Sequence, residues 1–267
     1  MMTRIISAVV GIPLILLLVY LGQVYFLAAV MLLSLLAAAE LGRMLKRMGI
    51  KDMQVFLYTG ALLFPLLLYY EASWLPNFLA LFVFSGALIS LNQYPESKLG
   101  DLGANFFSIL YIAFGFSHFV LLRQMEQGLL LVIYAFVVIW LTDTGAYFTG
   151  TYLGKRPFFQ EISPNKTVEG AIGGLVAGVI GAVLFCLLVN RRLNLDHTGF
   201  LILLSPLLSA AGQFGDLFES SLKRQARVKD SSRLIPGHGG ILDRFDSALW
   251  VIPLLYHLLQ LRINIFM

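Results

Sequence analysis

The sequence predicts an all-α integral membrane protein that crosses the bilayer about nine times. Three observations carry this prediction. The 267 residues are 58% hydrophobic and only 13% charged, whereas a soluble domain has about a quarter of its residues charged. The mean hydropathy is +0.82. Apolar runs of roughly 17–25 residues, the length that a helix needs to cross a bilayer, recur along the whole chain.

The apolar runs define the expected spans in chain order. The first is interpreted as a true span because no small-residue cleavage site follows it, as one would in a secretory leader. Connections are short except for 151–167 and 223–240. We therefore expect one membrane domain over residues 1–267, in which 1–102 are amino-terminal spans and 103–267 carry the chemistry. The nine expected spans are 5–22, 24–41, 54–70, 74–92, 104–122, 128–150, 168–190, 199–222 and 241–263.

Basic residues are distributed unevenly between the two sides of this arrangement. With nine spans, the amino terminus and the even-numbered loops share one side, which carries 15 Lys and Arg residues against 4 on the other. Such an excess marks the cytoplasmic side. We expect a multi-pass protein of the cytoplasmic (inner) membrane with its amino terminus in the cytoplasm. Setting the orientation or touching anionic lipid explains the basic residues Arg43, Lys46, Arg47 and Lys51 well.

Residues 216–246 concentrate charge in an otherwise apolar chain. Eleven of the 34 charged residues fall within these 31 positions. Charged side chains beside hydrocarbon are costly, so such a cluster indicates a functional site. Carboxylates suit hard divalent cations, and Lys and Arg suit phosphate oxygens. The segment therefore predicts a site for a metal-bound polyphosphate at the membrane surface.

The spacing of the polar residues predicts that part of this cluster lies along one face of a helix. Polar residues recur at intervals of 3 or 4 along the eighth span, which places them on one helix face. This stripe is acidic in its membrane half and basic beyond it. Its members are Gln213, Asp216, Ser220, Lys223 and Arg227.

A Pro-Gly-His-Gly-Gly turn at 236–240 breaks the helix after the stripe. Asp243 and Asp246 are three apart, so we expect them to share a face at the start of the ninth span. The turn should return them toward Asp216, and three carboxylates would then hold Mg²⁺. A helix cap with ion pairs explains the same acids equally well at this point. The basic residues expected to take phosphates are Lys223, Arg224 and Lys229.

A second constellation lies between the sixth and seventh spans. Asp143 is near the cytoplasmic end of the sixth, and Lys166 is in the following loop. Asp143 fits an interhelical hydrogen bond equally well, and Lys166 fits a topology charge. Ser163-Pro164 suits a helix start. Small residues on two faces of the seventh span predict close helix packing; they are Gly170, Gly173, Gly174, Ala177, Gly178 and Gly181.

From Ser220 to Asp246 the chain reads Ser-x-Leu-Lys-Arg-x4-Lys-Asp-x-Ser-x2-Ile-Pro-x-His-Gly-Gly-Ile-x-Asp-Arg-Phe-Asp. This pattern resembles the signature of the phosphatidate cytidylyltransferase, or CDP-diacylglycerol synthase, family at every fixed position over 27 residues. Residues 143–147 and 163–170 are similar to that family too. They depart from it at Asn165, where Lys is usual, and at Val168, where an aromatic residue is usual. The first four spans are similar only in being hydrophobic.

The resemblance implies an enzyme that makes CDP-diacylglycerol and pyrophosphate from CTP and phosphatidic acid. It also implies a homodimer and Mg²⁺, with K⁺ as an option for a second cation. The metal ligands it implies are Asp216, Asp243 and Asp246. The catalytic residues it implies are Asp216, Lys223, Arg224, Lys229, Asp230, His238, Asp243, Arg244 and Asp246. The substrate-binding residues it implies are Asp143, Ser163, Lys166, Thr167, Glu169, Ser220, Gly239 and Gly240.

Two other classes of protein would also place charges in a membrane. A secondary transporter would bind its substrate near the bilayer midplane, in broken helices from two related halves. The sequence shows no such paired halves, and its charges gather at one side. A CTP-dependent polyprenol kinase would transfer the γ-phosphate and release CDP. The small product formed from CTP therefore separates the alternatives.

Overall fold

The computed structural model describes residues 2–193, 198–235, 237 and 239–266. Of the residues expected in the site, His238 lies outside the described residues. Within the described part the regular elements are helical, accompanied by the isolated bridges Pro157–Thr167 and Ile235–Gly239. The all-α prediction is therefore confirmed.

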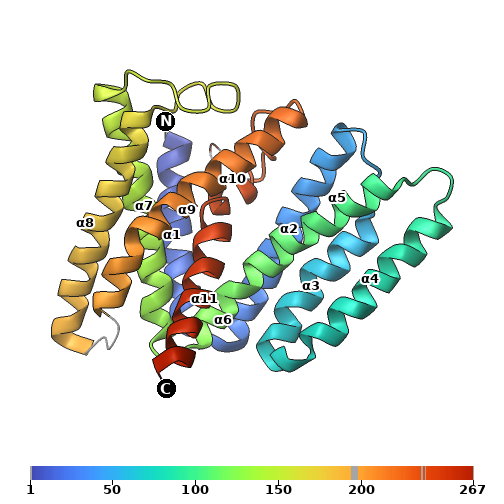
Figure 1. Cartoon of the computed structure of the whole chain (residues 1–267), viewed down its shortest axis with the longest axis horizontal. Coiled ribbons are helices and arrows are strands. Elements are labelled where there is room, and N and C mark those ends of the chain that lie inside the picture. Colours follow the sequence, from blue (N-terminus) through green and yellow to red (C-terminus); the bar gives the residue numbers. More distant parts are fainter. Residues whose placement is uncertain (1, 194–197, 236, 238, 267) are drawn as a thin grey trace. The chain divides into compact units, whose positions relative to one another are not determined.

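Figure 1 shows the helices in chain order. They are α1 (Met2–Leu21), α2 (Gln23–Arg47), α3 (Gln54–Tyr70), η1 (Ala72–Trp74), α4 (Leu75–Asn92), α5 (Leu99–Ile109), η2 (Leu110–Phe114), α6 (Gly115–Gln124), α7 (Gly128–Leu153), α8 (Val168–Leu193), α9 (Thr198–Gln225), α10 (Leu242–Phe245) and α11 (Ala248–Phe266). Segments α5, η2 and α6 follow one another without a break.

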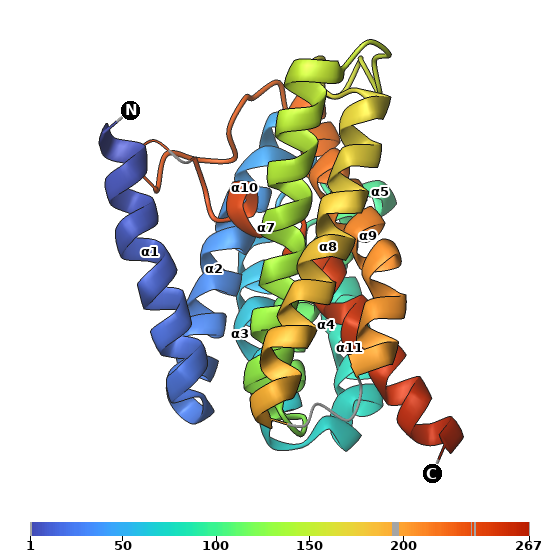
Figure 2. The same ribbon diagram turned by 90° about the vertical axis from the view of Figure 1, so that its left-hand side faces the viewer.

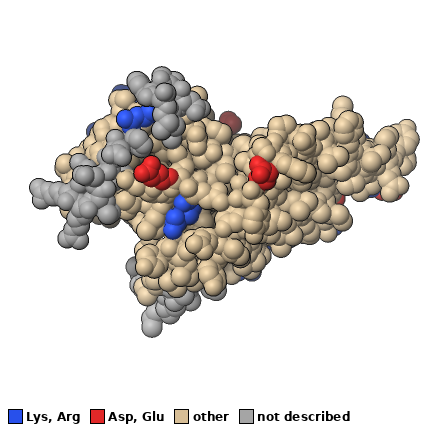
Figure 3. All heavy atoms as spheres, turned by 90° about the horizontal axis from the view of Figure 1, so that it is seen from below, with Lys and Arg blue, Asp and Glu red and all other residues tan. Residues whose placement is uncertain are grey.

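In the part of the chain that the structure describes, six helices are long and apolar enough to cross a membrane. They are Gln23–Arg47, Ala72–Asn92, Leu99–Gln124, Gly128–Leu153, Val168–Val189 and Thr198–Gln225. Figure 3 shows a face of the molecule with few charged side chains. The prediction of a multi-pass membrane protein is confirmed, and the count of nine spans stays a prediction.

The chain forms two compact units that alternate along the sequence. The first unit comprises residues 1–124 and 222–244, and the second unit comprises residues 125–221 and 245–267. Helix α9 therefore contributes to both units, and the segment that follows it as far as residue 244 belongs to the first. Of the expected metal ligands, Asp243 belongs to the first unit, and Asp216 and Asp246 belong to the second.

The first unit has an aromatic core where α3, α4, α5 and η2 approach one another. Phe56 stacks on Phe82 with ring centroids 4.1 Å apart, and such pairs stabilise a core beyond their buried area. The buried members are Met53, Phe56, Leu57, Phe64, Phe82, Ile109 and Ala113. Helix α2 packs against α3, the helix that supplies most of this core.

The second unit is built on close packing between α7 and α8, which lie side by side in Figure 2. A Cβ atom on Gly174 would lie 2.8 Å from the main-chain oxygen of Thr142, and one on Gly145 would lie 2.8 Å from that of Gly173. Thr142 also donates a hydrogen bond of 2.8 Å to Ser209 on α9. The predicted small-residue packing is confirmed.

Three local predictions were wrong. Helix α8 begins at Val168 and not at Ser163-Pro164, because the hydroxyl of Thr167 accepts the amide hydrogen of Gly170 and so caps the helix. Helix α9 ends at Gln225. Arg227 therefore leaves the predicted stripe, since it has a positive φ of 55° in a turn that closes the helix.

The third error concerns Asp243 and Asp246, which do not share a helix. Asp243 lies in the short α10, which ends at Phe245, and α11 begins at Ala248. The carboxylate of Asp246 accepts the amide hydrogen of Ser247 at 2.7 Å. A side chain that bonds the backbone locally offers an alternative to a continuing helix, so the chain breaks here.

We predict that Gly145→Ala lowers the thermal unfolding temperature of the purified protein. The added methyl group would press on the side chain of Ala177 and the backbone of Gly173, and neither can move aside cheaply. The matched control is Gly103→Ala in α5, where nothing lies within 4 Å. In this control, α5 should gain up to about 1 kcal/mol of stability, because Ala favours the helix more than Gly does. Equal unfolding temperatures for the two variants would contradict the packing argument.

Candidate active site

The second unit contains a cavity of about 530 Å³ with Asp143, Lys166 and Asp216 in its wall, and we call it the polar cavity after these side chains. Lys166, from the loop before α8, reaches Asp216 on α9 with Nζ 2.8 Å from Oδ2. Asp143 on α7 lines the same cavity. The structure therefore brings together the two constellations that the sequence showed separately. The lining is Asp143, Ala146, Tyr147, Gly150, Thr151, Phe158, Asn165, Lys166, Thr167, Gly170, Ala171, Gln213, Asp216 and Leu217.

The loop that carries Lys166 is held by a carboxylate. Oε2 of Glu169 accepts the amide hydrogens of Lys155 and Arg156 at 3.0 and 3.1 Å. The amide of Phe158 donates to the main-chain oxygen of Lys166. Glu169 thus holds the start of this loop through main-chain amides. Neither Glu169 nor Ser163 lines the cavity.

Asp246 lies beside α9, the helix that carries Asp216, in the second unit. A Cβ atom on Gly215 would lie 2.7 Å from the main-chain oxygen of Asp246, so the two backbones are nearly in contact. The negative charges of Asp216, Glu219 and Asp143 all act on the half-buried Asp246 carboxyl group. Acids gathered in this way favour a cation nearby.

An apolar groove adjoins the polar cavity. Its volume is about 190 Å³, and it shares Phe158, Ala171, Gln213 and Leu217 with the cavity. The rest of its lining comes from α8 and α9 and is apolar: Val168, Ile172, Leu175, Ala210 and Phe214. One continuous surface therefore changes from charged to apolar along these two helices.

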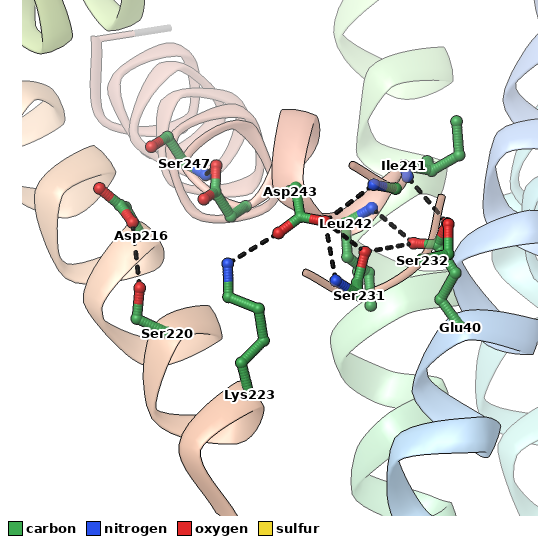
Figure 4. Close-up of polar contacts among 12 residues, drawn as sticks. Glu40, Asp216, Ser220, Lys223, Ser231, Ser232, Ile241, Leu242, Asp243 and Ser247 are labelled. Atoms are coloured by element: carbon green, nitrogen blue, oxygen red, sulfur yellow. Dashed lines mark hydrogen bonds and ion pairs between the residues drawn. The ribbon is translucent and has the colours of Figure 1, made fainter. Parts of the chain in front are cut away.

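The first unit holds the signature segment in a dense polar network, drawn in Figure 4. Nζ of Lys223 lies 2.7 Å from Oδ1 of Asp243. The other oxygen of Asp243 accepts hydrogen bonds from the amide and hydroxyl groups of Ser231 and from the amide of Gly240, at 2.7–2.8 Å. Asp243 therefore links Ser231 and Gly240, in the loop between α9 and α10, to Lys223 on α9.

These contacts decide the charge state of Asp243, which lies in the short α10, before the apolar helix α11. Burial by itself would raise the pKa of its carboxyl group. The hydrogen bonds from Lys223, Gly240 and Ser231, together with the positive charge of Lys223, outweigh burial and lower the pKa below its usual value. Asp243 is thus held as a carboxylate.

Sequence reasoning missed Glu40, the residue that anchors this network to α2. Its side chain is buried, and its carboxylate accepts the amide hydrogens of Ile241 and Leu242, each at 2.9 Å. The hydroxyl groups of Ser231 and Ser232 also lie 2.9 and 2.6 Å from it. The signal was available, because Glu40 is the only charged residue in the expected span 24–41.

The remaining predicted residues have more varied surroundings. Ser220 is 3.4 Å from Asp216 on the same helix. Arg224 and Arg244 are exposed at helix ends. Lys229 and Asp230 line a separate cavity of the first unit. A side chain on Gly239, whose φ is +82°, would meet Asp243.

The carboxylates fit a magnesium ion only in part. Among the described residues no group of three Asp, Glu, His or Cys side chains is placed to hold a metal ion. Both oxygens of Asp243 are engaged by protein donors. Asp216 and Asp246 both belong to the second unit, where the charge of Asp216 acts on Asp246, and one oxygen of Asp216 is paired with Lys166. Mg²⁺ is commonly held by one or two carboxylates with water and substrate phosphates as its other ligands. This pair is the part of the predicted set that suits the ion.

Comparison with known proteins agrees with these features. A family model described as "Cytidylyltransferase family" matches residues 2–262. The chain is 39% identical over 270 residues to a phosphatidate cytidylyltransferase of Bacillus subtilis, with 98% of each chain covered. It is 38% identical to one of Staphylococcus haemolyticus, over 97% of this chain and 99% of that protein. The chain therefore belongs to the cytidylyltransferase family.

Proposed function

We propose that this protein is a phosphatidate cytidylyltransferase that makes CDP-diacylglycerol and pyrophosphate for phospholipid biosynthesis. One observation carries the proposal: the chain is similar over nearly its whole length to relatives with that name. The polar cavity of the second unit supports it, since Lys166 and Asp216 supply the charges that phosphate chemistry needs.

In the proposed reaction an oxygen of the lipid phosphate attacks the α-phosphorus of CTP. The bond between that phosphorus and the bridging oxygen to the β-phosphate breaks, and pyrophosphate leaves. A phosphate monoester is already anionic, so no strong base is required. Catalysis then consists of positioning and of neutralising charge. Lys166 would contact a phosphate, in exchange for its present partner Asp216.

We also propose that Mg²⁺ takes part. Asp216 and Asp246 would hold it, and when bound it would neutralise charge on the phosphates. The place of Asp243 among the metal ligands stays a prediction, because Lys223 would first have to release it. The second cation and the homodimer stay predictions as well.

The apolar groove suggests how the lipid substrate binds. Phosphatidic acid has a charged head and apolar chains, and the cavity and the groove offer matching surfaces that share four residues. The head would lie near Lys166, while an acyl chain would lie along α8 and α9. A lipid bound in this way need not leave the bilayer completely.

We predict that the purified protein, given CTP and phosphatidic acid, releases pyrophosphate, and that Asp216→Asn lowers kcat/KM at least about tenfold. A hydrogen bond to a charged group contributes about 1.5–3 kcal/mol, and Asn cannot replace the carboxylate toward Lys166 or a cation. The measurement is a pyrophosphate-release assay at several Mg²⁺ concentrations. Release of CDP instead would identify a kinase and refute the proposed function.

The matched control for this assay is Glu161→Gln. Glu161 is an exposed acid of the loop that carries Lys166, and it does not line the cavity. Removing its charge should leave kcat/KM unchanged within about twofold. If Asp216→Asn behaved like this control, Asp216 would have no part in catalysis.

We predict that Ala210→Trp raises the KM for phosphatidic acid several-fold and leaves the KM for CTP unchanged. The indole would fill the apolar groove that Ala210 lines. The control is Leu203→Trp, at an exposed position of the same helix outside the groove. Initial rates would be measured in mixed micelles at varied lipid content. Equal effects on both KM values would refute the assignment of the groove to the lipid.

We predict that the loop with Lys166 faces the cytoplasm, where CTP is made. Glu161→Cys, in a Cys186→Ser background, should react with an impermeant thiol reagent in inside-out vesicles only. Glu126→Cys, in the connection between α6 and α7, should react in right-side-out vesicles only. Both positions are exposed glutamates, so differences in burial cannot explain the pattern. The opposite pattern would reverse the proposed topology.

A further inference from the structure

A second cavity, in the first unit, has five basic residues in its wall. It measures about 720 Å³ and lies against the carboxy-terminal end of α2 and the loop after α9. Cavities that bind small molecules usually measure about 300–1,000 Å³. Its lining is Arg43, Met44, Arg47, Arg227, Val228, Lys229, Asp230, Ser231, Ser232, Arg233 and Leu234.

Among the described lining residues of this cavity, one acid stands against five basic residues. Ion pairs seen in the described part of the chain include those of Lys51, Lys166 and Lys223, which lie outside this cavity. Asp230 is the only acid among the lining residues. Like charges repel, so an anion that enters this hollow would relieve the repulsion among five cations.

The fold assembles these charges from segments almost 200 residues apart. Arg43 and Arg47 are one helical turn apart, and Glu40 lies one turn earlier on the same side of α2. The buried Glu40 carboxylate holds the loop through Ser231 and Ser232. These hydrogen bonds therefore keep the basic residues of the loop beside Arg43 and Arg47 of α2.

Membrane orientation does not explain the placement. Topology requires positive charge on the cytoplasmic side but no particular cavity. Basic residues in the last turn of α2 are also favoured by the helix dipole, and that applies to Lys46 as much as to Arg47. Yet Lys46 is exposed outside the cavity, whereas Arg43 and Arg47 both line it.

The chemistry of the lining selects the ligand. Four of the five cations are arginines, whose planar guanidinium groups bind phosphate oxygens through paired hydrogen bonds. We infer that this cavity is a binding site for phosphate groups, and that Arg43 and Arg47 bind them directly. Two sources share this chemistry: a soluble polyphosphate, such as the pyrophosphate that the proposed reaction releases, and the phosphate of an anionic lipid.

The test is titration calorimetry of the full-length protein in neutral detergent with inorganic pyrophosphate. No CTP or phosphatidic acid is present, so the result does not depend on the proposed reaction. Arg43→Ala/Arg47→Ala should raise the Kd at least about tenfold, because charge-assisted contacts are lost. Lys46→Ala should change it less than about twofold. Arg233→Ala, on the loop wall, should also weaken binding and does not alter α2.

A second arm separates the two sources. Micelles are doped with phosphatidylglycerol, or with phosphatidylcholine as the control. If phosphatidylglycerol weakens pyrophosphate binding to the wild type and not to the double variant, a lipid headgroup competes for the cavity. If it has no effect while the double variant still loses binding, the ligand is soluble. The inference is overturned if the wild type binds neither probe, if the double variant binds like the wild type, or if Lys46→Ala loses as much.

Discussion

The structure of the first unit depends on one buried carboxylate. Burying a charge in an apolar helix is unfavourable unless hydrogen bonds replace its hydration. Glu40 meets this requirement with two main-chain amides and two hydroxyl groups. All four donors come from the signature segment, so the carboxylate is satisfied only when that segment lies against α2. The same geometry explains Gly240, since a side chain there would collide with Glu40 and Ser231.

Asp243 is a second carboxylate that depends on hydrogen bonds from the same segment. Ser231 bonds to Glu40 on one side and to Asp243 on the other, and Asp243 is paired with Lys223. A hydroxyl group has one hydrogen to donate, so Ser231 serves only one of the two carboxylates at a time. Lys223 and the amides compensate for this shortage at Asp243. The network is therefore coupled, and loss of any one member leaves a buried charge poorly solvated.

Hydropathy and spacing predicted the features that depend on local composition. Apolar runs located the helices, and small residues located the close contact of α7 with α8. The charged segment was also found, because a concentration of charge in an apolar chain needs no structure to be seen. Local rules failed where a distant partner decided the outcome. The role of Glu40 follows from contacts over about 200 residues of sequence, which one sequence does not display. The break between Asp243 and Asp246 is local, but the spacing of the two acids does not reveal the hydrogen bond from Ser247 that accompanies it.

The same limit applies to the basic residues. From the sequence, Arg43, Lys46 and Arg47 are equivalent, since each adds one positive charge to the side that topology assigns to the cytoplasm. The structure separates them, because two face a loop that the chain supplies nearly 200 residues later and one does not. A charge that orients a helix needs only to lie on the correct side of the membrane. A charge that binds a ligand must also point toward that ligand. Only the second property requires a defined neighbour, and Glu40 is the residue that fixes the neighbour in place.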